Sequence, residues 1–124
     1  MRFSLIMATR DRLEEIKRFL QSLAEQESFD IELIVVDQNP DDRLVELLNA
    51  YRRQFSIVHL KQLSPGASRA RNQGLAHSSG DIVGFPDDDC AYPPCFLGKV
   101  SHFFQHEKWD GLSVRIRNAS QLQA

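Results

Sequence analysis

Four short apolar runs, separated by stretches with helical spacing, constrain the fold of this chain more than any other feature. The runs are residues 3–8, 33–36, 57–60 and 82–85, and each has the length of a strand buried inside a parallel sheet. Strands that alternate with helices through short loops predict a parallel sheet with helices on both faces. We therefore expect an α/β, Rossmann-like fold with one domain over residues 1–124.

The first two helices are predicted from apolar residues that recur on one helical face. The first stripe consists of Leu13, Ile16, Leu20 and Leu23, and the second of Leu44, Leu47, Leu48 and Tyr51. Asp11 and Glu14 have the spacing of a capping box at the start of the first helix. An aspartate in the turn 39–42 is expected to cap the second helix.

Two further helices and one more strand complete the predicted elements. Residues 67–77 are expected to form a helix that packs closely, because several of its residues are small. A helix is predicted to follow Pro93 and Pro94 and to reach about His106, since proline fits the first turn of a helix. Residues 112–116 are expected to form the last strand.

Polar residues follow three of the predicted strands at the point where each strand ends. They are residues 9–11, Asp37 and residues 87–89. Ligands bind at the carboxyl ends of the strands in open parallel sheets, and these ends share one edge. The sequence therefore predicts a ligand site where these residues converge.

Three adjacent carboxylates, Asp87, Asp88 and Asp89, come directly after the fourth strand. They repel one another unless solvent or a cation relieves the repulsion, and their oxygens suit Mg²⁺ or Mn²⁺. A solvated acidic turn is the alternative interpretation. The position at a strand end favours a metal site.

Asp37 and two arginines are the remaining candidates. Asp37 has two interpretations, a turn residue or an acceptor of hydrogen bonds from a ribose or a base. Arg69 and Arg71 are two residues apart, so they point to different sides of a helix. Arginine suits phosphate oxygens, and a solvated helix face is the alternative.

Composition and cysteine spacing exclude several classes of protein. With 15 basic and 17 acidic residues the net charge is -2, which argues against a nucleic-acid-binding face. The two cysteines form no disulfide framework, so we expect a reducing, cytoplasmic location. A structural zinc site is disfavoured for the set Cys90, Cys95, His102 and His106. Only six residues separate Cys95 from His102, fewer than the roughly 12 between the pairs of a zinc finger.

No pattern for a serine or cysteine nucleophile is present, and His59 and His77 are interpreted as structural residues. A nucleotidyltransferase is disfavoured because the chain has no glycine-rich phosphate loop near its start.

Taken in order, four segments of the chain resemble the N-terminal part of family 2 glycosyltransferases, which have the GT-A fold. The segments are residues 8–12, 20–37, 66–74 and 80–89. The resemblance extends over about residues 3–116. It implies metal-dependent binding of a UDP- or GDP-linked sugar and inverting transfer to an unidentified glycan, lipid or protein. The cofactor would be Mg²⁺ or Mn²⁺.

The resemblance also implies roles for individual residues. Thr9 and Arg10 would lie against the nucleoside, Asp37 would contact the base, and Arg71 would lie near the diphosphate. Asp87 and Asp89 would be the outer members of a D-x-D motif and hold the metal.

Within that motif, Asp87 would also lie near the ribose or sugar. Asp88 occupies the variable middle position and is counted with the donor-binding residues.

The chain also departs from the family pattern. Gln38, Asn39 and Pro40 follow Asp37 where the family often has an acidic residue or asparagine, then glycine and serine. Cys90 stands where the family often has an acidic residue.

Inverting transfer needs a general base, which the family takes from the second half of its domain. The chain ends 35 residues after Asp89, and none of its residues matches that base. We therefore expect a truncated, donor-binding half without the acceptor half. The alternative is a non-catalytic interaction module that forms a homodimer through an open sheet edge. A position at the inner face of the cytoplasmic membrane is a further expectation.

Overall fold

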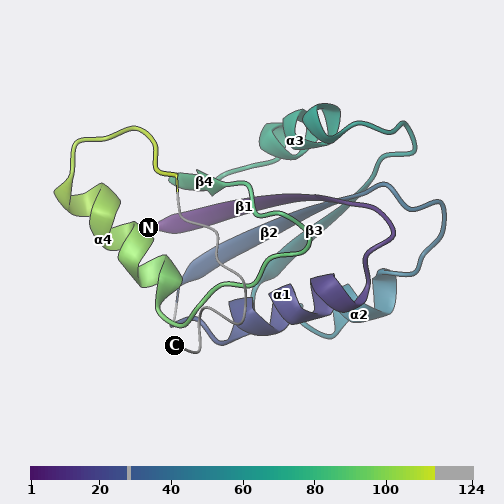
Figure 1. The fold of residues 1–124 in the computed structure, drawn as a ribbon, viewed down its shortest axis with the longest axis horizontal. Helices are drawn as coiled ribbons and strands as arrows, with labels where there is room; N and C mark the ends of the chain where they lie inside the picture. Colours follow the sequence, from purple (N-terminus) through teal and green to yellow (C-terminus); the bar gives the residue numbers. More distant parts are fainter. Residues whose placement is uncertain (28, 114–124) are drawn as a thin grey trace.

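The computed structural model describes residues 1–27 and 29–113. Its elements follow in the order β1 (Arg2–Thr9), α1 (Glu14–Ala24), β2 (Asp30–Asp37), α2 (Val45–Asn49), β3 (Ser56–Lys61), α3 (Ala67–Ala76), β4 (Ile82–Gly84) and α4 (Phe96–His106). The four strands form one parallel sheet in the order β3-β2-β1-β4 (Figure 1). The predicted parallel sheet is therefore confirmed.

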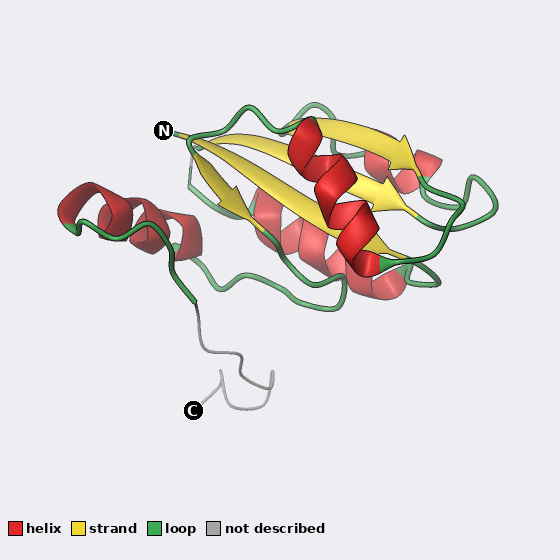
Figure 2. Ribbon diagram, turned by 90° about the horizontal axis from the view of Figure 1, so that it is seen from above, coloured by secondary structure: helices red, strands yellow, loops and turns green. Residues whose placement is uncertain are grey.

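Helices cover both faces of this sheet, as the alternation of strands and helices predicts. Helix α3 lies on one face, and α1 and α2 lie on the other (Figures 1 and 2). Successive residues of β1 point to opposite faces, so Leu5 and Met7 pack in the cluster with α1, while Ile6 packs against Ala70 of α3. Each face of the sheet thus has its own core.

Helix α3 lies close to the sheet because its inner residues are small. A Cβ atom on Gly74 would collide with a methyl group of Ile6, and Ala70 is fully buried. Gly66, at the N-terminal end of α3, has a φ of 144°, a conformation that favours glycine. The start of α3 is thereby held at the carboxyl edge of the sheet.

The predicted helix caps are wrong. Helix α1 begins at Glu14, and no side chain caps it. Asp11 instead has a φ of 57° and forms an ion pair with Arg43. Helix α2 also has no side-chain cap; Asp42 contributes only its carbonyl, which accepts a hydrogen bond from the Val45 amide.

The apolar stripe of α1 and the start of α4 also differ from their predictions. Leu13 is 44% exposed, and Phe19 is the buried residue that completes the stripe of α1. Helix α4 begins at Phe96, because Cys95 before it has a φ of 64°. The predicted strand 112–116 lies mostly outside the described residues, and residues 112–113 belong to no strand.

The opposite, amino edge of the sheet is held by a buried polar network. The Glu32 carboxylate accepts hydrogen bonds from the Ser4 hydroxyl at 2.7 Å and from the Ser79 amide at 3.0 Å. Glu32 is 7% exposed. Burial alone would raise the pKa of Glu32, but the bonds from Ser4 and Ser79 and the charge of Arg2 outweigh it and lower the pKa.

Helix α4 lies near the amino ends of the strands (Figure 1). Within residues 1–27 and 29–113, no helix is both long enough and apolar enough to cross a bilayer.

Candidate functional site

A cleft of about 300 Å³ lies at the carboxyl edge of the sheet. It is bounded by the ends of β1 and β2, the start of α3 and the turn after β4. Its lining residues are Ala8, Thr9, Arg10, Arg12, Gln38, Ala67, Arg71, Pro86, Asp87 and Asp88. Residues that follow β1 and β4 therefore converge in this cleft, whereas Asp37 does not line it.

The structure places five of the predicted site residues in this cleft and two outside its lining. Thr9, Arg10, Arg71, Asp87 and Asp88 line it. The other two are Asp89, which is exposed at the end of the same acidic turn, and Asp37, the last residue of β2, which is fully buried.

Asp88 is the member of the acidic turn that points toward the protein. Its carboxylate accepts a hydrogen bond of 3.0 Å from the Thr9 hydroxyl and lies 3.8 Å from the Arg12 guanidinium. The side chain of Asp88 is 20% exposed, whereas that of Asp87 is 58% exposed. The outer carboxylates of the turn are therefore the ones available to a ligand.

Arg71 reaches the cleft from the second turn of α3. Its guanidinium lies 3.9 Å from Asp87, and the two side chains are 45% and 58% exposed. An exposed ion pair of this kind contributes at most about 1 kcal/mol, so both groups can exchange it for a ligand. The N-terminal end of α3 contributes Ala67 to the same cleft, and the helix dipole favours an anion there.

The donor set fits a divalent ion that binds together with a phosphate ligand. In the part of the chain that the structure describes, no three His, Cys, Asp or Glu side chains gather around a common point. Asp87 and Asp89 supply two exposed carboxylates. Mg²⁺ is commonly held by one or two carboxylates plus substrate phosphates, so this pair suits such an ion.

Cys90 follows the acidic turn and stays protonated at neutral pH. Its burial, and then the charges of Asp87 and Asp89, raise the pKa of the thiol to about 11. A neutral thiol is a poor nucleophile and a poor metal ligand.

Two of the residues considered for zinc, Cys95 and His102, line a separate hollow of about 410 Å³ along α4. The thiol of Cys95 lies 3.5 Å from the Glu27 carboxylate. The rings of His102 and His106 stack with centroids 4.0 Å apart. This hollow is the larger of the two, but none of the polar residues that follow the strands lines it. The smaller cleft therefore remains the candidate site.

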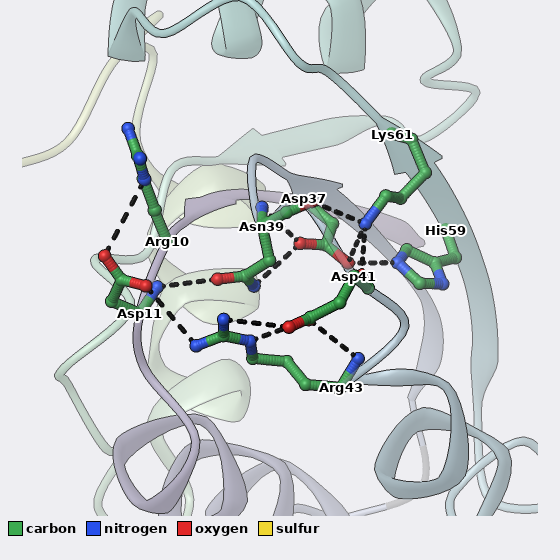
Figure 3. Close-up of polar contacts among 8 residues, drawn as sticks. All are labelled: Arg10, Asp11, Asp37, Asn39, Asp41, Arg43, His59 and Lys61. Atoms are coloured by element: carbon green, nitrogen blue, oxygen red, sulfur yellow. Dashed lines mark hydrogen bonds and ion pairs between the residues drawn. The ribbon is translucent and has the colours of Figure 1, made fainter.

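Asp37 is surrounded by donors at the end of β2 (Figure 3). One carboxylate oxygen accepts bonds from the Asn39 amide at 2.9 Å and the Asn39 side chain at 2.7 Å. The other accepts from His59 at 2.8 Å and Lys61 at 3.3 Å. These four donors match the four lone-pair positions of a carboxylate. A base contact from Asp37 would therefore require one of them to move.

The same donors keep Asp37 ionised. Burial alone would raise the pKa of Asp37, but the hydrogen bonds from Asn39, His59 and Lys61 together outweigh it and lower the pKa. His59 thus has a partner that the sequence interpretation missed. In the structure Asp37 pairs with Lys61 in the parallel register, and His59 lies two residues earlier, on the same face.

Three further residues at or near the site, Arg12, Gln38 and Asn39, were given no role in the sequence analysis. Arg12 lines the cleft beside Asp88. Gln38 also lines the cleft, and its side-chain oxygen accepts a bond of 3.0 Å from the Gly66 amide. The end of β2 is thereby tied to the start of α3. Asn39 is fully buried and joins two loops.

Known proteins that resemble this chain in sequence include glycosyltransferases. The family model described as Glycosyl transferase family 2 matches residues 4–122. An uncharacterized glycosyltransferase of Haemophilus influenzae is 32% identical over 97 residues, which are 78% of this chain and 32% of that protein. The poly(ribitol-phosphate) beta-N-acetylglucosaminyltransferase TarS of Staphylococcus aureus is 27% identical over 124 residues, covering 97% of this chain and 22% of that protein.

The fold of the chain also matches that of a solved structure. The crystal structure of S. aureus TarS 1-349 in complex with UDP-GlcNAc superimposes with a TM-score of 0.76 at 24% identity. The match covers 94% of this chain and 37% of that chain. The chain thus spans less than two fifths of the length of each of these relatives.

Proposed function

The chain belongs to glycosyl transferase family 2, and on this premise we propose that its cleft binds the nucleoside diphosphate of a sugar donor with Mg²⁺ or Mn²⁺. The fold is the Rossmann-like GT-A type, as its likeness to TarS shows. Inverting transfer of the sugar to a glycan, lipid or protein acceptor is part of the same proposal.

One observation carries the proposal. Arg71 and Asp87 face each other across 3.9 Å in a cleft that Arg10 and Arg12 also line. Three guanidinium groups beside an exposed acidic turn suit a ligand with two phosphates and a bridging cation. The start of α3 favours the same negative charge.

Each residue has a role that its position supports. Arg71 binds the diphosphate, while Thr9 and Arg10 lie against the nucleoside. Asp87 lies near the ribose or sugar and, with Asp89, holds the ion. A divalent ion held by these carboxylates would neutralise negative charge on the diphosphate leaving group.

Inverting transfer also needs a group that removes the proton of the acceptor hydroxyl. We assign that role to no residue of this chain. We therefore expect residues 1–124 alone to bind the donor without measurable sugar transfer.

A cytoplasmic location, including the inner face of the cytoplasmic membrane, belongs to the same proposal. The two cysteines, Cys90 and Cys95, are both free thiols, which suits a reducing compartment. Cell fractionation with an antibody to the chain would test the location.

A second candidate is a self-associating module of the same fold. Among the described residues, β4 pairs only with β1 and leaves its other edge open. Val83 is 37% exposed, and Phe85, just beyond this strand, is 48% exposed. An open edge with apolar neighbours favours pairing with a second chain. Sedimentation of the purified chain distinguishes a dimer from a monomer.

Calorimetric titration tests the main proposal. The purified chain is titrated with UDP and with GDP, each in the presence of Mn²⁺ and again with a chelator. UDP is the first choice because one solved relative is a complex with UDP-GlcNAc. Metal-dependent binding of one nucleotide supports the donor site. Binding of neither nucleotide by the folded chain favours the self-associating module.

A further inference from the structure

We infer that Asn39 is a positioning residue of the donor site, which holds the loop between β1 and α1 so that Arg10 and Arg12 lie at the cleft. This inference rests on the proposed function. Asn39 does not line the cleft, and it is one of the positions at which the chain departs from the pattern of its family. Its contribution to binding would therefore be indirect.

Both ends of the Asn39 side chain are occupied. Its amide nitrogen donates a bond of 2.7 Å to the Asp37 carboxylate, and its oxygen accepts a bond of 2.8 Å from the backbone amide of Asp11. Asn39 is 0% exposed, so water cannot replace either bond in the folded state. The side chain thus joins β2 to the loop that follows β1 (Figure 3).

The Asp37 end of this bridge is fixed. Asp37 is also held by His59 and Lys61. The ammonium group of Lys61 donates further bonds of 2.7 Å to the carbonyl of Asn39 and 2.6 Å to that of Asp41. The backbone and the side chain of Asn39 are therefore both anchored to the sheet. Asn39 can thus serve as a rigid support for the loop between β1 and α1.

The Asp11 end is the part of the loop that needs support. Asp11 has a φ of 57°, a left-handed conformation that is uncommon for residues other than glycine. The hydrogen bond that the Asp11 amide donates to Asn39 and the ion pair with Arg43 at 3.3 Å both hold Asp11. A change of this one dihedral angle would redirect the chain on either side of Asp11.

The residues on either side are Arg10 and Arg12, and both line the cleft. Their side chains are 57% and 45% exposed, so packing does little to fix them. Arg12 has one weak contact with Asp88 at 3.8 Å, and Arg10 has one with Asp11 at 3.7 Å. The backbone at Asp11 is therefore the main determinant of where the two charges lie.

The inference is tested with a mutant cycle in which the Kd for the nucleotide is measured for each variant. Asn39→Ala is made in the wild-type chain and in the Arg10→Ala/Arg12→Ala chain, and each is titrated with UDP or GDP, whichever the wild type binds with Mn²⁺. We expect Asn39→Ala to raise the Kd about tenfold in the wild type and less than about twofold in the double variant. An equal loss in both backgrounds would overturn the inference, because Asn39 would then act without the two arginines.

Glu32→Gln is the matched control. Glu32 lies on β2, the strand that precedes Asn39, and is also buried and hydrogen-bonded, but at the opposite edge of the sheet. We expect this variant to lower the thermal stability while the Kd of the folded chain stays within about twofold of the wild type. If it raised the Kd as much as Asn39→Ala does, the effect would be general destabilisation and the inference would be wrong.

A second measurement needs no variant. Hydrogen exchange of the Asp11 amide in the wild-type chain is expected to be slow, because this amide donates to buried Asn39. Free exchange of this amide would contradict the inference. If the wild type binds neither nucleotide, both the proposed function and this inference are wrong. If the wild type binds and Asn39→Ala binds equally well, only the inference fails.

Discussion

The Thr9 hydroxyl donates a hydrogen bond of 3.0 Å to the Asp88 carboxylate, which joins the end of β1 to the acidic turn across 79 residues of sequence. Thr9 is almost completely buried. This bond turns the middle aspartate of the triplet toward the protein. Asp87 and Asp89 on either side are left exposed; Asp87 lines the cleft, and Asp89 lies at the end of the same turn.

Replacement of Thr9 by valine tests this bond. Thr9→Val keeps the shape of the side chain and removes the donor, which should lower the free energy of unfolding by about 1 kcal/mol. Thr9→Ser keeps the hydroxyl and is the matched control. Urea unfolding measures both variants, and equal stability of the valine and serine variants would show that the bond contributes nothing.

Asp89→Ala should abolish the effect of metal on nucleotide binding. Asp89 is the exposed end of the acidic turn, and an ion between the turn and a diphosphate would lose one of its few protein ligands. Glu107→Ala, which removes an exposed carboxylate just beyond α4, is the control. Calorimetry with Mn²⁺ and with chelator gives the comparison, and unchanged metal dependence in Asp89→Ala would refute the metal assignment.

Arg71→Ala should weaken binding of the nucleoside diphosphate more than binding of the nucleoside. A charge-assisted bond to phosphate contributes about 1.5–3 kcal/mol, and the nucleoside lacks that partner. Arg69→Ala is the control, because Arg69 is exposed on the same helix but does not line the cleft. The account fails here if UDP and uridine lose affinity to the same extent.

Gly74→Ala should destabilise the chain although alanine favours a helix. Its Cβ would collide with Ile6, so α3 must move away from β1 at a cost of about 1–3 kcal/mol. Gly111→Ala is the control, because its Cβ would meet no atom within 4 Å. Thermal unfolding compares the two, and a Gly74→Ala chain as stable as the wild type would contradict the close packing of α3.

Asp37→Asn should change how stability depends on pH. The pKa of Asp37 is lowered from its ordinary value of 3.8, so its ionised form stabilises the fold above that pH. This contribution is lost as the pH falls below 3.8 through the folded-state pKa. The variant should therefore be less stable than the wild type at neutral pH, and the difference should narrow in acid.

Urea unfolding over a series of pH values measures that difference. Asp42→Asn, in the same loop but exposed and without a side-chain bond among the described contacts, is the control. A difference between Asp37→Asn and the wild type that stays constant from neutral pH into acid would contradict the account of Asp37.

The pattern of the sequence predicts the sheet and the edge of the site well. Residues such as Leu5 and Leu33 lie in apolar runs that are long enough for one strand each and too short for most helices. Parallel strands place their carboxyl ends at one edge, so the strand order alone predicts that Thr9 and Asp87 converge.

The contacts within the site could not be predicted in the same way. Asp11 has the spacing of a cap, but a local pattern does not show that Arg43 and Asn39 hold it in a left-handed conformation. The pairing of His59 with Asp37 depends on the register of two strands, which apolar runs do not fix to a single residue.

The most direct test of the central claim is to locate the bound nucleotide on the chain by two-dimensional proton–nitrogen NMR. The chain is titrated with UDP and with GDP in the presence of Mg²⁺, which does not broaden the signals. The account predicts that amide shifts concentrate in the loop at residues 9–12, the start of α3 and the acidic turn, while the turn around Ser79 stays unchanged. Shifts concentrated along α4 or at the amino edge of the sheet would contradict it.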